Sequence, residues 1–209
     1  MKKTRRPAFW AAAMLLAAAC SSTPSGPPRN VANACSILDQ RDDWGEALTD
    51  AERRWAAPPH IVMAIIWRES SFRADARPPK KYAFLGMIPD GRVSSAYGYP
   101  QALDGTWDWY REETGESGAE RDDFSDAVDF VGWYLNKTQQ MNGLAKSDAY
   151  NQYLAYHEGH TGYTRGRWRE KGWLMNAASQ VAAQAELYRM QLSDCSGRLA
   201  AARSPANPA

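Results

Sequence analysis

An almost unbroken apolar run that ends in a glutamate constrains this chain more than any other feature. Residues 61–72 read IVMAIIWRESSF, and the Pro-Pro pair at 58–59 stands where proline favours the first turn of a helix. A helix through the run places Ile65 and Ile66 one turn behind Glu69, so we expect the Glu69 carboxyl group at the wall of an apolar core. Burial of this kind raises the pKa of a carboxyl group, because it disfavours the ionised form.

A carboxylic acid that keeps its proton near neutral pH is what cleavage of a glycosidic bond requires. The leaving sugar oxygen must receive a proton as the bond breaks. The run by itself also allows a second interpretation, in which Glu69 faces water at a helix end beside the polar Arg68. Two further blocks of sequence favour the acid.

These blocks follow in the order of one known enzyme family. Residues 69–72 (ESSF) match an E-S-x-F signature, residues 97–107 (YGYPQALDGTW) are similar to a G-L-M-Q-x-x-P-x-T block, and residues 154–159 (LAYHEG) are similar to an A-Y-N-x-G block. Over residues 55–192 the chain resembles the soluble lytic transglycosylases. It departs from them where Tyr-Pro replaces Leu-Met at 99–100, where His157 replaces Asn, and in a longer segment after the first block.

The resemblance implies a lytic transglycosylase, a carbon–oxygen lyase acting on the glycan strands of peptidoglycan without a cofactor or metal. In that family one glutamate, here Glu69, protonates the leaving sugar at the β-1,4 bond between N-acetylmuramic acid (MurNAc) and N-acetylglucosamine (GlcNAc). The 2-acetamido group of MurNAc assists, and the same glutamate then acts as base, which leaves 1,6-anhydroMurNAc ends. No second catalytic carboxylate is needed, whereas ordinary glycosidases use a pair.

Substrate contacts are expected in the same three blocks, at Ser70, Tyr97, Gln101, Tyr156 and His157. The resemblance implies a Tyr156 hydroxyl near the scissile sugar, although a core tyrosine bonded to the backbone is the alternative. Gln101 has both a donor and an acceptor for an N-acetyl group, or else braces the acid from behind. Aromatic faces suit sugar rings, which motivates Tyr97.

The N-terminus predicts an exported protein. Four basic residues among the first six precede an apolar run at 8–19 that is shorter than the roughly 20 residues of a membrane span, so residues 1–19 are predicted to be a signal peptide. The small residues 17–19 before Cys20 resemble a lipobox, which makes Cys20 the expected lipidation site. Plain cleavage after an A-x-A site is the alternative. The resemblance to bacterial lipoproteins implies that Ser21, in place of an Asp retention signal, sorts the chain to the outer membrane, and thus a periplasmic, lipid-anchored protein.

Residues 20–34 are rich in Ser, Pro and Gly, so we expect the lipidated cysteine to be followed by a flexible linker. Loss of residues 1–19 would remove four basic residues and no acidic one, which changes the formal net charge from +1 to −3. With no basic stripe and no phosphate-binding loop, nucleic acid is not an expected partner.

Two cysteines remain in the mature chain, Cys35 and Cys195, at the two ends of the expected globular domain (35–195). In an oxidising compartment they predict a disulfide, with two unpaired buried thiols as the alternative. Beyond them, residues 196–209 are small and polar and are predicted to be disordered.

The domain is predicted to be all-α, with about six to eight helices, in agreement with the lysozyme-like fold that the resemblance implies. Apolar stripes cover 37–48, 124–135 and 174–192, a capping box at 49–52 predicts a helix start, and a helix is expected from Ser147 to Gly159.

Residues 73–93 mix Pro, Gly and charge, and are expected to form a loop or short hairpin beside the cleft. Tyr82, Phe84 and Met87 could then contact substrate, unless the loop packs on itself.

Three other functions are compatible with parts of the sequence. A goose-type muramidase would share the fold and hydrolyse the bond, with Asp104 or Glu158 positioning a water. A zinc enzyme could use His157, Glu158 and His160, although helical zinc sites space their histidines four apart. A peptidoglycan-binding lipoprotein could have kept the fold and lost turnover.

Overall fold

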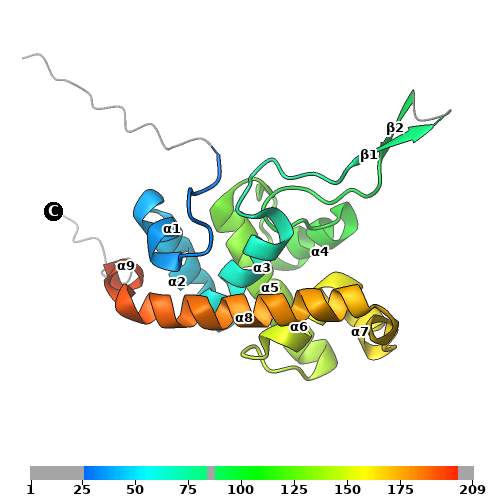
Figure 1. Cartoon of the computed structure of the whole chain (residues 1–209). Helices are drawn as coiled ribbons and strands as arrows, with labels where there is room; N and C mark the ends of the chain where they lie inside the picture. Colours follow the sequence, from blue (N-terminus) through cyan, green and yellow to red (C-terminus); the bar gives the residue numbers. More distant parts are fainter. Residues whose placement is uncertain (1–25, 84–87, 202–209) are drawn as a thin grey trace, which may run out of the picture.

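The structure is a computed structural model that describes residues 26–83 and 88–201 (Figure 1). Within these ranges the chain is helical apart from one two-stranded antiparallel sheet, which confirms the all-α prediction. In chain order the elements are α1 (Ala34–Gln40), α2 (Trp44–Trp55), α3 (Pro59–Ser70), β1 (Lys80–Ala83), β2 (Ile88–Arg92), α4 (Asp104–Thr114), α5 (Phe124–Asn142), α6 (Ala149–Glu158), α7 (His160–Thr164), the 3-10 helix η1 (Arg167–Glu170), α8 (Gly172–Asp194) and α9 (Ser196–Ala201). None of the helices in the described ranges has both the length and the hydropathy that a bilayer crossing requires.

α3 runs through the middle of the molecule because it is apolar on nearly every face. Residues 61–66 are all buried, and α2, α5 and α8 pack around them. Pro59 occupies the first turn, where its missing N–H costs no hydrogen bond. The helix ends at Ser70, so its last turn carries Glu69 out of this packed centre.

α8 is the longest helix and lies along one side of the domain, where α1, α3 and α6 pack on it (Figure 1). The predicted stripe is confirmed, because every one of its members is buried: Leu174, Ala177, Ala178, Val181, Ala185, Tyr188 and Leu192. The predicted start of α5 is also confirmed, and the Asp123 side chain caps it by accepting from the N–H groups of Ser125 and Asp126.

α2 and α5 approach closely at Gly132, where an added Cβ would lie 2.8 Å from Cδ1 of Trp55. The capping-box prediction at 49–52 is wrong, because this segment lies inside α2, which already begins at Trp44. The Thr49 hydroxyl instead donates to the carbonyl of the residue four positions earlier, at 2.9 Å.

The N-terminal linker prediction is wrong for residues 26–33, which lie against the domain. The buried Arg41 donates to the Gly26 carbonyl, and the Tyr188 hydroxyl donates to the Val31 carbonyl. These side chains of the folded domain satisfy backbone groups that the linker cannot satisfy by itself. The remainder of the predicted linker, Cys20 included, lies outside the described residues.

Cys35 in α1 and Cys195 after α8 are joined by a disulfide with a Cα–Cα distance of 5.9 Å. The bridge spans 160 residues and thus closes the two ends of the domain onto each other.

The prediction of a disordered tail is wrong for residues 196–201, which form α9 against α2. Leu199 packs on the core, and its carbonyl accepts from the Thr49 hydroxyl at 3.2 Å. An ion pair joins Arg198 to Asp39. The segment has few apolar residues of its own, so its helix depends on these contacts with α1 and α2.

The loop-or-hairpin prediction for residues 73–93 is confirmed by β1 and β2, which pair antiparallel and project away from the helices (Figure 1). Tyr82 on this arm is 56% exposed. Phe84 and Met87 lie outside the described residues.

Candidate active site

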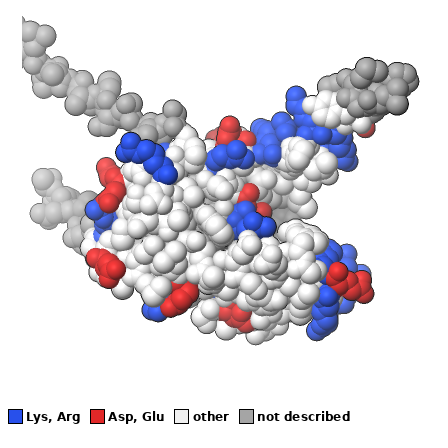
Figure 2. All heavy atoms as spheres, in the orientation of Figure 1, with Lys and Arg blue, Asp and Glu red and all other residues white. Residues whose placement is uncertain are grey.

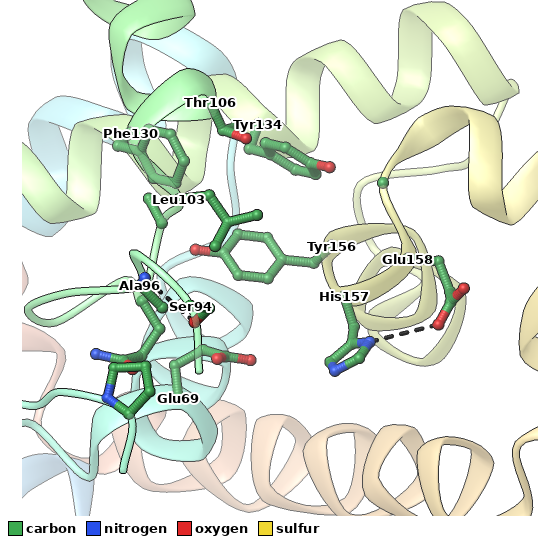
Figure 3. A pocket seen from close by; sticks show the side chains of 14 residues that line it. Glu69, Ser94, Ala96, Leu103, Thr106, Phe130, Tyr134, Tyr156, His157 and Glu158 are labelled. Atoms are coloured by element: carbon green, nitrogen blue, oxygen red, sulfur yellow. Dashed lines mark hydrogen bonds and ion pairs between the residues drawn. The ribbon is translucent and has the colours of Figure 1, made fainter. Parts of the chain in front are cut away.

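A cavity of about 530 Å³ opens where the end of α3, the base of the hairpin, the start of α4, and the facing parts of α5 and α6 meet (Figure 3). It is lined by Glu69, Pro78, Ser94, Ala96, Gln101, Ala102, Leu103, Thr106, Phe130, Tyr134, Tyr156, His157, Glu158 and Gly159. All three sequence blocks therefore contribute to one cavity, although not through every residue that was predicted.

The Glu69 carboxyl group lies at the wall of this cavity. Its Oε1 atom is buried and has no hydrogen-bond partner among the described residues. Burial raises the pKa of Glu69 to about 7, although the Tyr153 hydroxyl and the Arg68 guanidinium act to lower it. Near neutral pH about half of the molecules thus hold a proton that can be given to a bound ligand. This geometry disagrees with a helix-end glutamate that faces water.

The backbone turns sharply after Glu69. Ser71 and Phe72 both have left-handed dihedral angles, with φ of 53° and 58°, which are unfavourable for residues other than glycine. The Phe72 ring is fully buried and stacks on Trp44 at 5.7 Å, so packing holds the turn in place. The same packing fixes the direction in which the end of α3 presents the acid.

Tyr156 forms the wall above Glu69 (Figure 3). Its hydroxyl donates to the Pro100 carbonyl at 2.7 Å, and its ring packs edge-on against Tyr134 at 5.0 Å. The backbone bond is the one that a core tyrosine would make, yet the side chain lines the cavity. Its phenolic oxygen can still accept a hydrogen bond from a sugar hydroxyl.

Gln101 lines the cavity and also ties loops together. Its Nε2 donates to the carbonyls of Ala76 and Gly98, at 2.9 and 2.8 Å, and its backbone is left-handed with φ of 50°. The amide nitrogen is therefore used by the protein, which leaves the amide oxygen as the group that can meet a ligand. Gln101 braces the loop from 76 to 98.

His157 lies across the cavity from Glu69 (Figure 3). Its Nδ1 is 3.5 Å from the Glu158 Oε1, and its ring meets the exposed Trp173 edge-on at 5.0 Å. Burial lowers the pKa of His157, against the opposing effect of Glu158. A neutral imidazole therefore faces the ligand space at pH 7.

The structure does not bring Ser70 and Tyr97 to the cavity. The Ser70 side chain is buried, and its hydroxyl donates to the Ile66 carbonyl at 3.1 Å inside α3. The Tyr97 hydroxyl donates to Asp122 at 2.6 Å on another part of the surface, where Arg77 lies over its ring. Both side chains have found partners in the protein, which corrects the predicted substrate contacts.

Asp104 and Glu158, either of which could position a water in a hydrolase, are both held in ion pairs. Asp104 does not line the cavity and pairs with Arg121 at 2.8 Å. Glu158 lines it, but its Oε1 is 2.6 Å from Lys171 Nζ. Burial acts to raise the pKa of Glu158, and the hydrogen bond and charge of Lys171 outweigh it, so the pKa lies below its ordinary value.

The histidines of the zinc hypothesis do not converge. The buried His160 ring stacks on Tyr134 at 4.5 Å, and its Nε2 lies 3.1 Å from Thr138 Oγ1, whereas His157 contacts Trp173. In the described ranges there is no group of three or more His, Cys, Asp or Glu side chains that could hold a metal ion.

Sequence reasoning missed the tyrosine that interacts with the acid. The Tyr153 hydroxyl acts to lower the pKa of the Glu69 carboxyl group, against the larger effect of burial. Tyr153 precedes Tyr156 by three residues on α6, so the helical spacing of the two tyrosines was the signal available. Phe130 and Tyr134 on α5 also line the cavity and were not predicted. Their spacing of four residues, which places them on one face of the helix, was the signal available for them.

The comparison with known families agrees with this geometry. A family model described as "Transglycosylase SLT domain" matches residues 8–195, which is a wider range than the three blocks cover. No curated protein matches the chain. The match extends over most of the sequence and includes every residue of the cavity, so the chain belongs to the transglycosylase SLT domain family.

Proposed function

We propose that this chain is a lytic transglycosylase that cleaves the β-1,4 bond between MurNAc and GlcNAc in peptidoglycan and leaves 1,6-anhydroMurNAc ends. The observation that carries the proposal is the Glu69 carboxyl group, which has a pKa of about 7 and one buried oxygen without a partner in the described part of the chain. Membership of the SLT family supports the class of reaction.

In the first step Glu69 donates its proton to the oxygen of the leaving GlcNAc as the bond to C1 of MurNAc breaks. The carbonyl oxygen of the 2-acetamido group of MurNAc bonds to C1 and forms a cyclic oxazolinium ion. The amide oxygen of Gln101 and the Tyr156 hydroxyl line the same cavity and are suited to orient this sugar.

In the second step the ionised Glu69 accepts the proton of the C6 hydroxyl of MurNAc. O6 bonds to C1, the bond from the acetamido oxygen to C1 breaks, and Glu69 is again protonated. A pKa near 7 suits both steps, because the group must give and take a proton at the same pH.

The second carboxylate of the cavity supports this mechanism over hydrolysis. Glu158 is paired with Lys171, and in the view of Figure 3 His157 lies between Glu158 and Glu69. A hydrolase of the ordinary kind needs a second free carboxylate to activate water or to act as nucleophile.

The test is to digest purified glycan strands with the protein that lacks residues 1–20 and to weigh the released fragments. Anhydro ends are lighter than hydrolysed ends by one water. Anhydro products that disappear in Glu69→Gln support the proposal. Hydrolysed ends would indicate a muramidase, and binding to the strands without any product would indicate a peptidoglycan-binding protein.

Proteins with SLT domains act on peptidoglycan in the periplasm, and we propose the same location here. The lipid anchor on Cys20 and the outer membrane are part of this proposal, and they depend on the sequence of the first 21 residues. The short N-terminal apolar run supports export.

A further inference from the structure

Two groups of basic side chains, all exposed except the half-buried Lys171, flank the cavity. The first, the hairpin bases, consists of Lys80, Lys81 and Arg92. The hairpin begins just after Pro78 and ends just before Ser94, both of which line the cavity. In Figure 2 blue side chains lie on this arm, above a hollow in the surface.

The second group, the η1 bases, consists of Arg165, Arg167, Arg169 and Lys171. They follow Gly159, a cavity residue, by way of the short α7. Figure 2 shows basic side chains on the lobe on the opposite side of the same hollow. The cavity therefore lies between two basic flanks.

The hairpin brings the like charges of the hairpin bases together, although the Arg92 guanidinium also donates to the Pro78 carbonyl at 2.6 Å. Lys80 is paired directly opposite Arg92 in the antiparallel ladder, and like charges in that position are destabilising. Neither these two residues nor Lys81 forms an ion pair within the described part of the chain. An anionic ligand would relieve this repulsion.

The η1 bases are equally crowded. Four basic residues stand at alternate positions of 165–171, with Glu170 as the one acid among them. Lys171 and Arg167 contact the buried Glu158. Arg165 and Arg169 are exposed and make no ion pair with any described acid.

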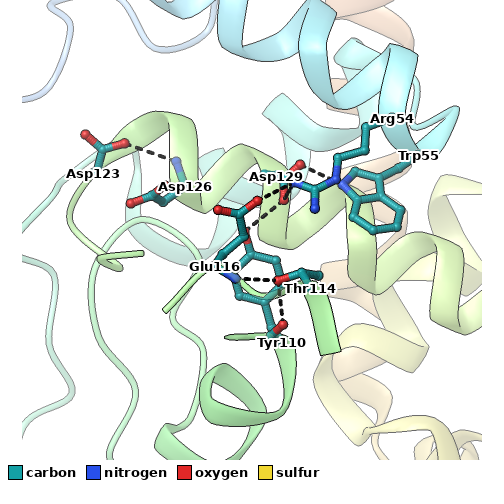
Figure 4. Close-up of polar contacts among 8 residues, drawn as sticks. All are labelled: Arg54, Trp55, Tyr110, Thr114, Glu116, Asp123, Asp126 and Asp129. Atoms are coloured by element: carbon teal, nitrogen blue, oxygen red, sulfur yellow. Dashed lines mark hydrogen bonds and ion pairs between the residues drawn. The ribbon is translucent and has the colours of Figure 1, made fainter. Parts of the chain in front are cut away.

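A second cavity of the domain has the opposite composition. It measures about 620 Å³ and lies between α2 and α5, lined by six acidic residues and two arginines. There Arg54 is neutralised by Glu116 at 2.8 Å and by Asp129 at 3.1 Å, and Tyr110 and Trp55 also bond to Asp129 (Figure 4). Charge is thus segregated in a chain whose formal net charge is only +1, and the bases gather beside the site of Glu69.

We propose that the cleft selects glycan strands that still carry stem peptides, whose carboxylates the hairpin bases and the η1 bases contact. This inference rests on the proposed function. None of the hairpin bases, Arg165 or Arg169 lines the cavity itself, so they are placed for groups that project from the sugar chain and not for the sugars. Stem peptides carry free carboxylates away from the sugar chain, whereas the lactyl carboxylate of a strand without peptides lies on the sugar.

The experiment compares two substrates, intact glycan strands with stem peptides and the same strands after an amidase has removed the peptides. Exposed carboxylate contacts are individually weak, so we expect the wild-type rate at limiting substrate to favour peptide-bearing strands by about three- to tenfold. The preference should shrink when salt is raised from about 50 to about 300 mM, because exposed charges are screened.

Two double variants test the flanks, Lys80→Ala/Lys81→Ala and Arg165→Ala/Arg169→Ala. Each is expected to bring the ratio of the two rates toward one while its melting temperature stays near wild type. Arg53→Ala/Arg189→Ala is the matched control, since it removes the same charge from exposed arginines elsewhere on the surface and should leave the ratio unchanged.

A wild-type protein that cleaves both substrates equally would overturn the inference and leave the proposed function standing. The inference would also be overturned if the control variant lowered the ratio of the two cleavage rates as much as the flank variants do. If the flank variants keep the ratio but no longer bind phosphatidylglycerol vesicles, the bases serve a membrane surface and the inference is wrong. If the wild type cleaves neither kind of strand, the proposed function fails. In that case co-sedimentation of the protein with each substrate tests the inference separately, and equal binding to strands with and without peptides would refute it.

Discussion

Lys171 Nζ lies 2.6 Å from Oε1 of the buried Glu158, and this ion pair makes the two glutamates of the cavity chemically different. Glu158 keeps a pKa below its ordinary value, with Lys171 outweighing the effect of burial. Among the described residues no such cation bonds to the buried oxygen of Glu69, and the pKa of Glu69 is about 7. At neutral pH Glu158 is ionised and Glu69 can donate a proton.

The first prediction is that Glu69→Gln folds and does not cleave peptidoglycan. The amide keeps the shape of the side chain and removes the proton donor, so the loss of turnover should exceed the roughly 10²–10⁴-fold of a typical general acid, because the same group also serves as base. Release of anhydro fragments measures it. Activity within tenfold of wild type would refute the role of Glu69, and Glu158→Gln is the control, with a smaller expected loss.

The second prediction concerns stability against pH. The pKa of Glu69 is raised from 4.5 in an exposed carboxyl to about 7 in the fold, so the folded state holds a proton that the unfolded state loses. Its effect on the free energy of unfolding is absent below about pH 4.5 and becomes increasingly unfavourable as pH rises toward 7, by at most about 3 kcal/mol. Glu69→Gln removes this term. In urea unfolding, the free energy of unfolding of the variant should increase relative to that of the wild type between about pH 4.5 and 8. A constant difference between the two free energies over this pH range would contradict the prediction.

The third prediction concerns Tyr153. The rate should fall as pH rises through about 7, because Glu69 then loses the proton that it donates. The Tyr153 hydroxyl lowers that pKa, so Tyr153→Phe should move the falling limb of the pH–rate profile to higher pH. Tyr97→Phe is the control, because its hydroxyl bonds to Asp122 outside the cavity. A limb that stays in place in Tyr153→Phe, or moves equally in both variants, would show that Tyr153 does not tune the acid.

The fourth prediction tests the disulfide between Cys35 and Cys195. Closing a loop of 160 residues restricts the unfolded chain, so Cys35→Ser/Cys195→Ser should lower the free energy of unfolding by about 2–5 kcal/mol. Reductant should destabilise the wild type and leave the variant unchanged. Labelling of both thiols in the exported, denatured and unreduced protein would show that the bridge does not form.

The fifth prediction compares two truncations at the C-terminus. Deletion of residues 196–209 removes α9, with the Leu199 packing and the Arg198–Asp39 ion pair, and should cost about 1–3 kcal/mol of unfolding free energy. Deletion of 202–209 alone should leave the unfolding curve unchanged. Equal effects of the two deletions would show that α9 contributes nothing.

The sequence predicted some elements of the fold correctly and others wrongly. The stripe of α8 and the bounds of α6, which Asp148 and Gly159 cap, follow from side chains within one or two turns of each other, and both were predicted correctly. The same holds for the burial of Glu69, because the apolar run behind it is continuous in sequence. Residues 26–33 and α9 were mispredicted, since Arg41, Tyr188 and Thr49 hold them from distant positions.

For the site, the sequence by itself determined that Glu69 would be buried and which three blocks contribute to the cavity around it. Only the tertiary structure decided which side chains of those blocks line the cavity. Ser70 and Tyr97 found partners inside the protein, whereas Tyr153 came to the carboxyl group of Glu69 from a helix 84 positions further along the chain. The apolar periodicity of a helix depends on residues a few positions apart, so it can be derived from the local sequence. The partner of a polar side chain depends on which helices pack together, so it cannot.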